Sequence, residues 1–502
     1  MSESPHIPAG RGIAVSISEF RQLLSLATPT VLVQLGLMAM GVVDTIMVGR
    51  VSAEALAAVA LGNLYFMTVA IVGMGILMSL DPVVAQAVGA RDTLRISRGV
   101  QRGIVLALAM TPPVLLVLLG AGPLFRVTGQ PVDVWPTAVA FVNANMPGVP
   151  AFFLFVALRQ TLTAYGKLTP IVLTIAIANV INAGLGWVLI YGNLGFPALG
   201  AVGSGWGTTI SRYAMLAILF ALARPTILPM LKPFRSDAFD LRALVRMTAI
   251  GLPIGLAFLL EVAIFALVGL LMGRMGTIPL AGHQVAINLA SLTFMVPMGV
   301  GVAAAALVGR AVGRRDAKGV RRAARLSLVC GATFMALSGL TLLLFPRPLA
   351  TLYTSDPAVI AVAAALLPLA GFFQVFDGLQ VVASGILRGI GDTRAPMIVT
   401  MIGYWVIGLP VSLFLGHRLG LGPQGLWWGF VAGLATVALF LVLRVRSRVR
   451  KAIAPVVIDE DRGEGLRLES AIGPDGDRTS QGIADTSTTA RRTNTEPSAS
   501  SR

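Results

Sequence analysis

Three acidic residues interrupt long apolar stretches of the sequence, and their chemistry is that of cation binding. Glu261 lies in the middle of the stretch 249–276, while Asp44 and Asp377 lie within two other apolar stretches. Such an acid costs about 2.5–3.5 kcal/mol on membrane-insertion scales, so a chain keeps it where it faces a polar cavity or a partner. Carboxylate oxygens bind a proton or a hard cation. We therefore predict cation binding at all three acids, with a Na⁺ or H⁺ site at Glu261 and Asp377.

Amide side chains recur at helical spacing around Asp377 and in the apolar stretch 279–306. Residues three or four apart share one face of a helix, and a stripe of amides facing lipid is unfavourable, so we expect these faces to turn inward beside Glu261. Alternatively, the amides only join neighbouring helices. Phe373 could stack on a cationic ligand or simply pack. The predicted cavity residues of this half are Gln284, Asn288, Phe373, Gln374 and Gln380.

A second polar group is expected in the first half of the chain, around Asp44. The residues predicted to act with it are Gln34, Asn179 and Asn182. The alternative is that Asp44, which is nearer the end of its helix, reaches the membrane interface. Pro29 and Pro253 each remove a backbone donor inside an apolar stretch, so we predict a helix bend at both.

The composition indicates which elements must hold these side chains. Of 502 residues, 56% are hydrophobic and only 12% are charged, which is too little charge to cover a soluble protein. The net charge of +16 is then explained by basic loops on one side of a bilayer rather than by nucleic-acid binding. No Walker A sequence, zinc-type His/Glu pair or nucleophile elbow stands at a convincing position. We expect neither an enzyme nor a cofactor, and energy from an ion gradient.

Twelve apolar stretches predict an all-α polytopic membrane protein with twelve transmembrane helices. The loop region 310–325 holds seven arginines and lysines, whereas the loops on the opposite side hold at most one each. This bias predicts a protein of the inner membrane with both termini in the cytoplasm. The predicted helices are 23–49, 56–80, 99–121, 134–158, 168–192, 198–222, 244–272, 279–306, 324–346, 357–387, 396–416 and 422–446.

The two halves of the sequence repeat. Pro29 matches Pro253 and Gly166 matches Gly391, at an offset of about 224 residues that other matches share. Six helices separate the copies, so the repeat is parallel and predicts two six-helix lobes related by pseudo-two-fold symmetry around a central cavity. The expected parts are a cytoplasmic segment 1–20, a lobe 21–222, a cytoplasmic linker 223–243, a lobe 244–446 and a disordered cytoplasmic tail 447–502.

Several motifs resemble those of the multidrug and toxic compound extrusion (MATE) family, most closely its NorM branch. They are the run from Pro29 to Gly49, the run Leu280–Asn288, and the runs Phe376–Gln380 and Leu387–Pro396. The resemblance covers about 20–446 and implies a V-shaped pair of lobes that exports cationic drugs and dyes in exchange for Na⁺ or H⁺. It places Glu261 and Asp377 on that branch's cation site, Asp44 on its first-helix aspartate, and Gln284 on its eighth-helix glutamine.

The chain departs from that branch at two positions. Gly186 stands where a polar residue usually follows the asparagine that matches Asn182, and Phe373 stands where some members have tyrosine. The expected function is a monomeric multidrug antiporter for small cationic or amphipathic molecules, working by alternating access in the lipid bilayer. The alternatives are a flippase for lipid-linked precursors, which needs a basic cavity where the apolar stretches show almost no arginine or lysine, and a membrane-embedded enzyme or channel.

Overall fold

A computed structural model describes residues 17–451 and 453–459, and in this part of the chain every regular element is helical. The chain divides into residues 1–456 and residues 457–502, and the described residues of the second part, 457–459, form no helix. The helices are α1 Ile17–Gly49, α2 Ala53–Leu77, α3 Leu80–Ala90, α4 Thr93–Leu118, α5 Ala121–Val127, α6 Trp135–Asn145, η1 Met146–Gly148, α7 Val149–Tyr165, α8 Thr169–Tyr191, α9 Gly200–Leu231, η2 Ser236–Phe239, α10 Leu241–Met275, α11 Thr277–Gly313, α12 Ala317–Leu344, α13 Pro346–Thr351, α14 Pro357–Ile390, α15 Arg394–Met401, η3 Ile402–Gly408, α16 Leu409–Leu413, η4 Phe414–Arg418 and α17 Gly422–Arg448.

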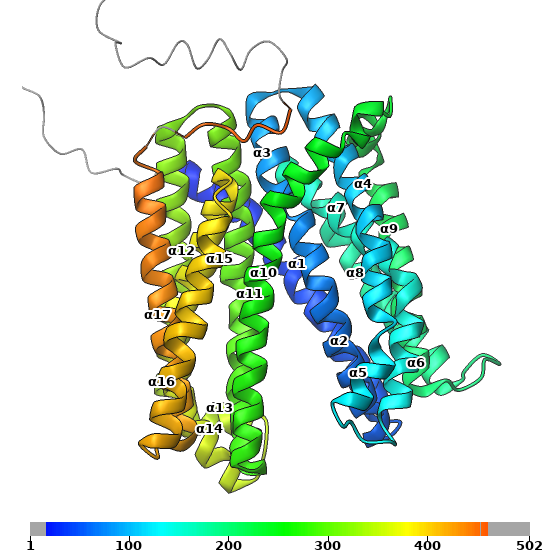
Figure 1. The fold of residues 1–502 in the computed structure, drawn as a ribbon, viewed down its shortest axis with the longest axis vertical. Helices are drawn as coiled ribbons and strands as arrows, with labels where there is room; N and C mark the ends of the chain where they lie inside the picture. Colours follow the sequence, from blue (N-terminus) through cyan, green and yellow to red (C-terminus); the bar gives the residue numbers. More distant parts are fainter. Residues whose placement is uncertain (1–16, 452, 460–502) are drawn as a thin grey trace, which may run out of the picture. The chain divides into compact units, whose positions relative to one another are not determined.

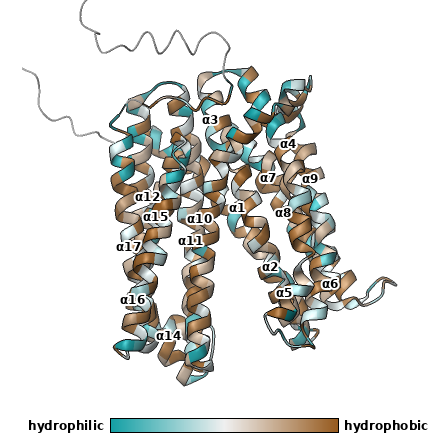
Figure 2. Cartoon of the chain, viewed as in Figure 1, coloured by the Kyte–Doolittle hydropathy of each residue, from teal (hydrophilic) through white to brown (hydrophobic). Residues whose placement is uncertain are grey.

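These helices form twelve spans within the described residues that are long and apolar enough to cross a membrane, which confirms the predicted number. Some spans are built from more than one helix, such as α2 with α3, and α15 with η3, α16 and η4. Hydrophobic residues cover the middle of the helices, and hydrophilic residues gather toward their ends (Figure 2). Exposed side chains such as Leu116, Val180 and Leu337 are those expected to contact lipid.

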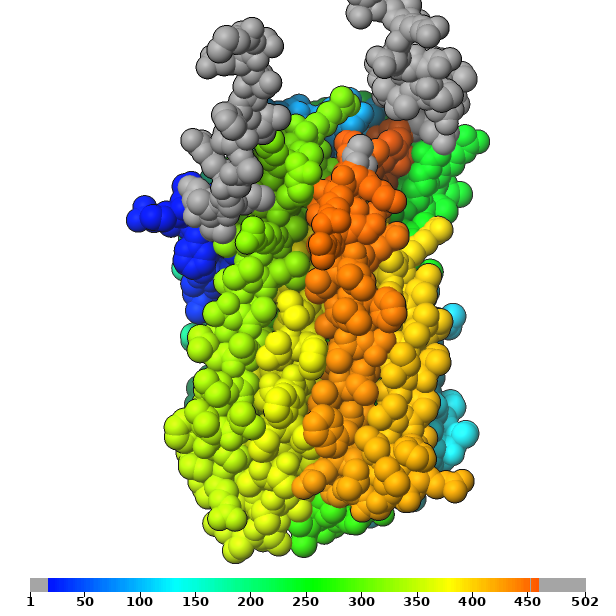
Figure 3. All heavy atoms as spheres, turned by 90° about the vertical axis from the view of Figure 1, so that its left-hand side faces the viewer, coloured from blue at the N-terminus to red at the C-terminus, as the bar shows by residue number. Residues whose placement is uncertain are grey.

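Helices α1–α9 form a first lobe and helices α10–α17 form a second lobe (Figure 1). The first lobe is held by the packing of α8 on α1 and α9, and by α6 on α2 and α9. In the second lobe α14 packs on α11, α12 and α17, and α12, α14 and α17 lie side by side on one outer face (Figure 3). The lobes contact each other through α2 with α10, α1 with α11, and α3 with α11.

The backbone repeats the sequence repeat. Arg91 and Arg315 both adopt the left-handed conformation after α3 and α11, with φ of 58° and 56°. The next residue in each copy caps the following helix: Asp92 accepts from the N–H of Arg95 at 2.9 Å, and Asp316 accepts from the N–H of Gly319 at 2.8 Å. Two copies of one loop geometry at one sequence offset support the predicted pseudo-two-fold relation of the lobes.

Glycines mark the places where the lobes cross, and they too occur in matched pairs. A Cβ on Gly75 of α2 would collide with Gly255 of α10, and a Cβ on Gly299 of α11 would collide with Val31 of α1. The same reciprocity holds between α3 and α11. There a Cβ on Gly89 would meet the carbonyl of Arg310, and a Cβ on Gly313 would meet the carbonyl of Gln86. The small residues let the helix backbones touch across the lobe interface.

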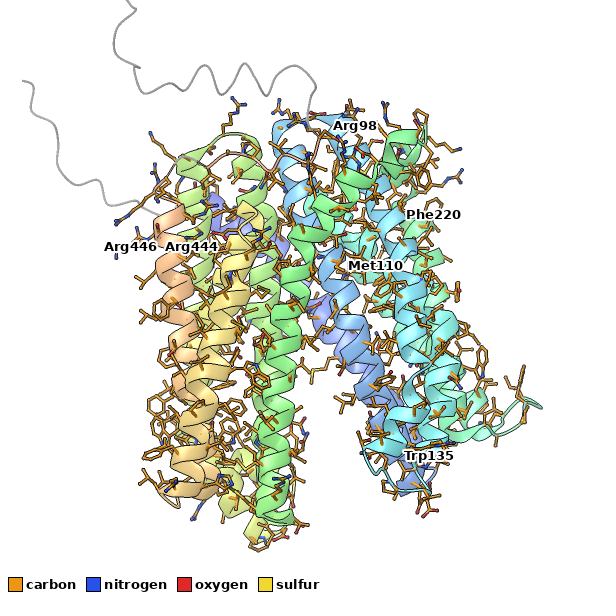
Figure 4. The ribbon with its side chains drawn as sticks, in the orientation of Figure 1. Arg98, Met110, Trp135, Phe220, Arg444 and Arg446 are labelled. Carbon is orange, nitrogen blue, oxygen red and sulfur yellow. The ribbon has the colours of Figure 1, made fainter. Side chains whose placement is uncertain are left out.

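Charged residues concentrate at one end of the helices, called here the arginine-rich end. Arg98, Arg444 and Arg446 extend there, whereas Trp135 lies at the opposite end (Figure 4). Arg98 donates to Asp237 at 2.8 Å and Arg235 donates to it at 3.1 Å. Burial alone would raise the pKa of Asp237, but these hydrogen bonds and positive charges outweigh it and hold the pKa below its ordinary value. The carboxylate therefore stays charged at neutral pH and ties α4 to the connection between the lobes.

Several helix boundaries differ from those expected, and one of them shortens the connection between the lobes. Helix α9 continues to Leu231, beyond the predicted end at 222, because Ala223, Ile227 and Met230 bury their side chains along it. The connection to the second lobe is correspondingly shorter than 223–243. Of the segments predicted to be a cytoplasmic N-terminus and a disordered tail, residues 1–16, 452 and 460–502 lie outside the described part. Within the tail, Val456 donates its backbone N–H to the side chain of Gln86 at 2.7 Å, so its first residues follow the helical body.

Candidate functional site

A cavity of about 830 Å³ lies between the two lobes. Its lining is mainly apolar and rich in methionine, including Met40, Met67, Met74, Met78, Met295 and Met298. Met side chains adapt to irregular shapes, which suits a site that accepts varied ligands. Five charged residues also line it, three of them the predicted acids. They are Asp44, Arg159 and Arg212 from the first lobe, and Glu261 and Asp377 from the second.

In the second lobe, Glu261 belongs to a hydrogen-bonded group formed by three helices. The side-chain amide of Gln380 on α14 donates to Glu261 Oε1 at 3.0 Å. The hydroxyl of Tyr404 on η3 donates to Gln380 Oε1 at 2.9 Å, and it lies 3.4 Å from Glu261 Oε1. Sequence spacing predicted Gln380 beside Glu261, and the structure places them in contact. The amide and the phenol both hold the carboxyl group in one orientation.

Asp377 of α14 is the second acid of this lobe, and its side chain is 6% exposed. Its Oδ1 atom is buried and accepts no hydrogen bond from any described residue. The carboxyl groups of Asp377 and Glu261 are near enough to repel each other when both are charged. A buried acceptor without a partner, next to a second acid, is suited to receive a proton or an oxygen-coordinated cation between the two.

The other amides of the second lobe divide into two groups. Gln374 is fully buried and donates to Thr293 Oγ1 at 2.6 Å, so it joins α14 to α11, while its carbonyl oxygen has no described partner. Like Gln374 and Gln380, the other two amides predicted for this pocket, Gln284 and Asn288, are not among its lining residues. They lie on the helical stripe of α11 that carries Ser291 into the cavity, but one to two turns closer to the start of the helix, where the Gln284 side chain is exposed.

Phe373 lines the cavity and also packs in an aromatic cluster of the second lobe. Its ring lies 6.0 Å from that of Phe265 and 5.9 Å from that of Trp427, measured between ring centroids. Phe430 stacks on Phe265 at 4.7 Å. The cluster buries the side of α14 that carries Asp377, so the two readings of Phe373, ligand ring and packing residue, are both compatible with its place.

Tyr404 is a site residue that sequence reasoning missed. It is buried in the middle of a span, in a stretch of π-helical turns over Ile402–Gly408 that widens the helix locally. A signal was present, because tyrosine is usually enriched at membrane interfaces and this one stands deep in the apolar stretch 396–416. Tyr404 contributes a phenol hydroxyl to the site, which the phenylalanine at position 373 cannot.

We expect Tyr404→Phe to weaken this group without dismantling it. The substitution removes one hydroxyl that donates to Gln380, and a neutral hydrogen bond contributes about 0.5–1.5 kcal/mol net. The cation affinity of the site should therefore fall by no more than about tenfold, with full-length protein still produced. Cation-dependent protection against thermal unfolding, titrated in both proteins, measures the change. An unchanged titration midpoint would show that the phenol does not orient the acids.

In the first lobe, Asp44 is the centre of a polar group on α1, α8 and α9. Asn182 donates to Asp44 Oδ1 at 2.6 Å, and Ser211 donates to Asn182 at 3.0 Å. Thr208 lies 3.4 Å from Asp44 Oδ2. The structure thus brings Asp44 and Asn182 together as predicted, and it lines the cavity with Asp44. Two hydroxyls of α9 thus belong to this polar group, to which Gly186 contributes no side chain.

Two other residues predicted around Asp44 are placed differently. Gln34 lines the cavity and its amide lies 2.9 Å from the sulfur of Met298, across the lobe interface. Asn179 is not a lining residue; it donates to the carbonyls of Gly36 at 3.0 Å and Ile175 at 2.8 Å, and so joins α8 to α1. Pro29 and Pro253 lie inside the continuous helices α1 and α10. Whether they bend these helices during function stays a prediction.

The expectation that the membrane-spanning interiors hold almost no arginine is wrong. Arg159, Arg212 and Arg388 lie inside α7, α9 and α14. The guanidinium of Arg212 lies over the ring of Phe66 at 4.3 Å and interacts electrostatically with Asp44. Arg159 and Arg388 were hidden in the sequence because they lie near the ends of apolar stretches, where a basic residue is usually assigned to the interface. Arg212 lies well inside the predicted helix 198–222 and was overlooked.

Asp81 is a further buried acid of the first lobe. It is 4% exposed at the start of α3, where its Oδ2 forms an ion pair with Arg388 Nε at 2.9 Å. Gln160 donates to its other oxygen at 2.8 Å. Because Arg388 belongs to the second lobe, this buried pair joins the lobes. Gln86 adds a further link by donating to the carbonyl of Gly389 at 2.9 Å.

Comparison with known proteins gives relatives along nearly the whole helical body. The MatE family model matches residues 29–188 and 253–414, one stretch in each lobe. The multidrug resistance protein MdtK of Edwardsiella ictaluri is 36% identical over 436 residues, which are 85% of this chain and 95% of the relative. MdtK of Yersinia pseudotuberculosis is 36% identical over 440 residues, which are 86% of this chain and 96% of that relative.

Among solved structures, the eukaryotic MATE transporter AtDTX14 has a TM-score of 0.79 at 21% identity, and the match covers 87% of this chain and 98% of that one. A likeness at this identity shows the shared fold, whereas the family model and the MdtK relatives carry the assignment. The twelve spans and these relatives establish an integral, multi-pass membrane protein. The chain belongs to the MatE family.

Proposed function

We propose that this protein is a multidrug efflux transporter that exports small cationic or amphipathic molecules in exchange for Na⁺ or H⁺. The observation that carries the proposal is the pair of acids, Glu261 and Asp377, on one wall of an apolar cavity between two lobes. Apolar walls accept varied molecules, and the acids attract a cationic group. The name of the MdtK relatives, multidrug resistance protein, agrees with it.

The coupling follows from the charge that these acids share. When a proton or Na⁺ binds between Glu261 and Asp377, their mutual repulsion falls and α10 and α14 can approach. A cationic substrate competes for the same negative charge, so the coupling ion and the substrate exclude each other. Each ligand can shift the equilibrium between outward- and inward-open forms only by its difference in affinity for the two. Exchange then needs no energy source other than the ion gradient.

The groups present fit both coupling ions. A Na⁺ ion would take its oxygens from Glu261, Asp377 and a neighbouring amide such as Gln374, whose carbonyl has no partner among the described residues. A proton would need only the two carboxyl groups. We propose the same orientation that the loop charges predict: the inner membrane, with the arginine-rich end and both termini in the cytoplasm. The cavity would work in a monomer, since this chain supplies both walls.

The flippase alternative is less well supported. A cavity for pyrophosphate needs a strongly basic surface. Here Arg212 interacts with Asp44, which leaves Arg159 against the two acids of the second lobe. The balance of charge favours a ligand with at least one cationic group.

The test is flux of a cationic dye from proteoliposomes that contain the purified protein. A Na⁺ gradient and a pH gradient are imposed separately, with the membrane potential clamped to zero. We expect one of the two to drive dye movement above that in protein-free liposomes, and the effective gradient identifies the coupling ion. Dye movement that neither gradient alters would contradict an antiporter.

A further inference from the structure

Arg159 stands out among the charged residues of the cavity because no residue in the described part of the chain neutralises it by contact. It lines the cavity from α7, and its guanidinium forms no hydrogen bond or ion pair with any residue in the described ranges. Its Nε atom is buried without a partner. We propose that Arg159 is a subsite for an acidic group of the transported molecule, so that the cavity takes zwitterions as well as simple cations. This inference rests on the proposed export function.

The nearest acid of the same lobe is already occupied. Asp81 interacts with Arg159 only at longer range, because its Oδ2 pairs with Arg388 at 2.9 Å and its Oδ1 accepts from Gln160 at 2.8 Å. The hydroxyl of Thr163 donates to the backbone carbonyl of Arg159 at 2.8 Å and accepts no hydrogen bond from the guanidinium. The charged head of Arg159 is therefore left to the cavity.

The other arginine of the cavity lacks this freedom. Arg212 packs over Phe66 and Phe152, donates to the carbonyl of Asn145 at 3.4 Å and faces Asp44. Aromatic rings and a carboxylate therefore already stabilise its positive charge. Arg159 has no such set, although a guanidinium carries five donors in a planar fork that matches a carboxylate.

The position of Arg159 defines which molecules would use it. It is six residues before the end of α7, about 9 Å along the helix from the arginine-rich end, on the first lobe. Glu261 and Asp377 lie on the second lobe. A molecule that spans the cavity can thus present an acidic group to one wall and a cationic group to the other. Its apolar body would rest on the methionines between them.

The experiment uses two dyes that differ in one group: a rhodamine with a free carboxylate, which is zwitterionic, and its methyl ester, which is a cation. Binding of each to purified protein is measured by fluorescence anisotropy. The variants are Arg159→Gln, which removes the charge, and Arg159→Lys, which keeps it without the fork. Arg274→Gln is the matched control, because it removes an exposed arginine outside the cavity lining. Thermal unfolding shows whether each variant is folded.

We expect Arg159→Gln to weaken binding of the carboxylate dye by about tenfold, which corresponds to about 1.4 kcal/mol. Binding of the ester should change by less than about twofold, because only the carboxylate dye can form a charge-assisted hydrogen bond with Arg159. Arg159→Lys should recover part of the difference, and Arg274→Gln should match the wild type for both dyes. An equal loss for both dyes, or no loss for either, overturns the subsite.

Failure of the export function gives a different result. It is seen as no gradient-driven movement of the ester dye by the wild-type protein. Failure of the subsite instead leaves that movement intact and abolishes only the selective effect of Arg159→Gln on the acid.

Discussion

We expect Glu261→Gln to reduce ion-driven export strongly while the protein still folds. Glutamine has nearly the shape of glutamate and can keep a hydrogen bond with Gln380, but it carries no charge and cannot take up a proton at this site. Loss of one of two acids removes both the attraction for the coupling ion and the repulsion that ion binding relieves. We expect gradient-driven dye flux in proteoliposomes to fall by at least about tenfold, a loss of at least about 1.4 kcal/mol of ion interaction.

Glu54→Gln is the control for this experiment. Glu54 is an exposed acid in the first turn of α2, outside the cavity lining, so its substitution changes the net charge by the same amount. Its flux should equal that of the wild type. Wild-type flux in Glu261→Gln at equal protein amount would show that the coupling ion does not use this acid. Asp377→Asn should behave as Glu261→Gln does if the two acids act as a pair.

Arg388→Met should destabilise the protein strongly. The substitution leaves Asp81 buried with one hydrogen bond from Gln160 and no cation in contact. Removal of one partner of a buried ion pair costs about 3–5 kcal/mol, because the remaining charge is not compensated. Asp81→Asn should have a similar effect, since it strands the buried Arg388. Thermal unfolding in detergent and the yield of folded protein measure both losses.

The double variant Asp81→Asn with Arg388→Met separates pairing from packing. With both charges gone, we expect a large part of the lost stability to return, because an apolar and an amide side chain need no buried counter-ion. The pair also joins the two lobes, so the double variant should favour the form in which they separate at the arginine-rich end. If the stability lost in the double variant equals the sum of the losses in the two single variants, Asp81 and Arg388 are not directly coupled.

The sequence allowed the scaffold and the acids to be predicted with more success than their partners. Twelve helices followed from the apolar stretches, and the matched prolines and glycines indicated two related lobes. Spacing along α14 grouped Gln374, Asp377 and Gln380 correctly on one helix. Periodicity reports which residues share a face of one helix, however, and not which helix lies opposite. Tyr404 was therefore missed, although its hydroxyl lies beside Gln380.

The same limit explains the arginines. Arg159 and Arg388 lie near the ends of their apolar stretches, where the long side chain of a basic residue normally extends to the water outside the membrane. Only the packing of α3 against α14 shows that Arg388 meets Asp81 instead. For Gln284 the helical face was predicted correctly. How far the cavity extends along α11 could not be predicted, because it depends on how the lobes meet.

The reciprocal glycine contacts have a consequence for the origin of the molecule. Gly89 meets Arg310 as Gly313 meets Gln86, and each position in one contact is the repeat equivalent of a position in the other. Surfaces in which residue i meets j while j meets i form an isologous interface, the kind that joins the subunits of a two-fold homodimer. The lobes therefore meet as two subunits of one ancestral dimer would. The equivalence has been lost where Val31 occupies the position of Gly255, and at Asp44, Glu261 and Asp377, each of which has no acid at the equivalent position of the other lobe.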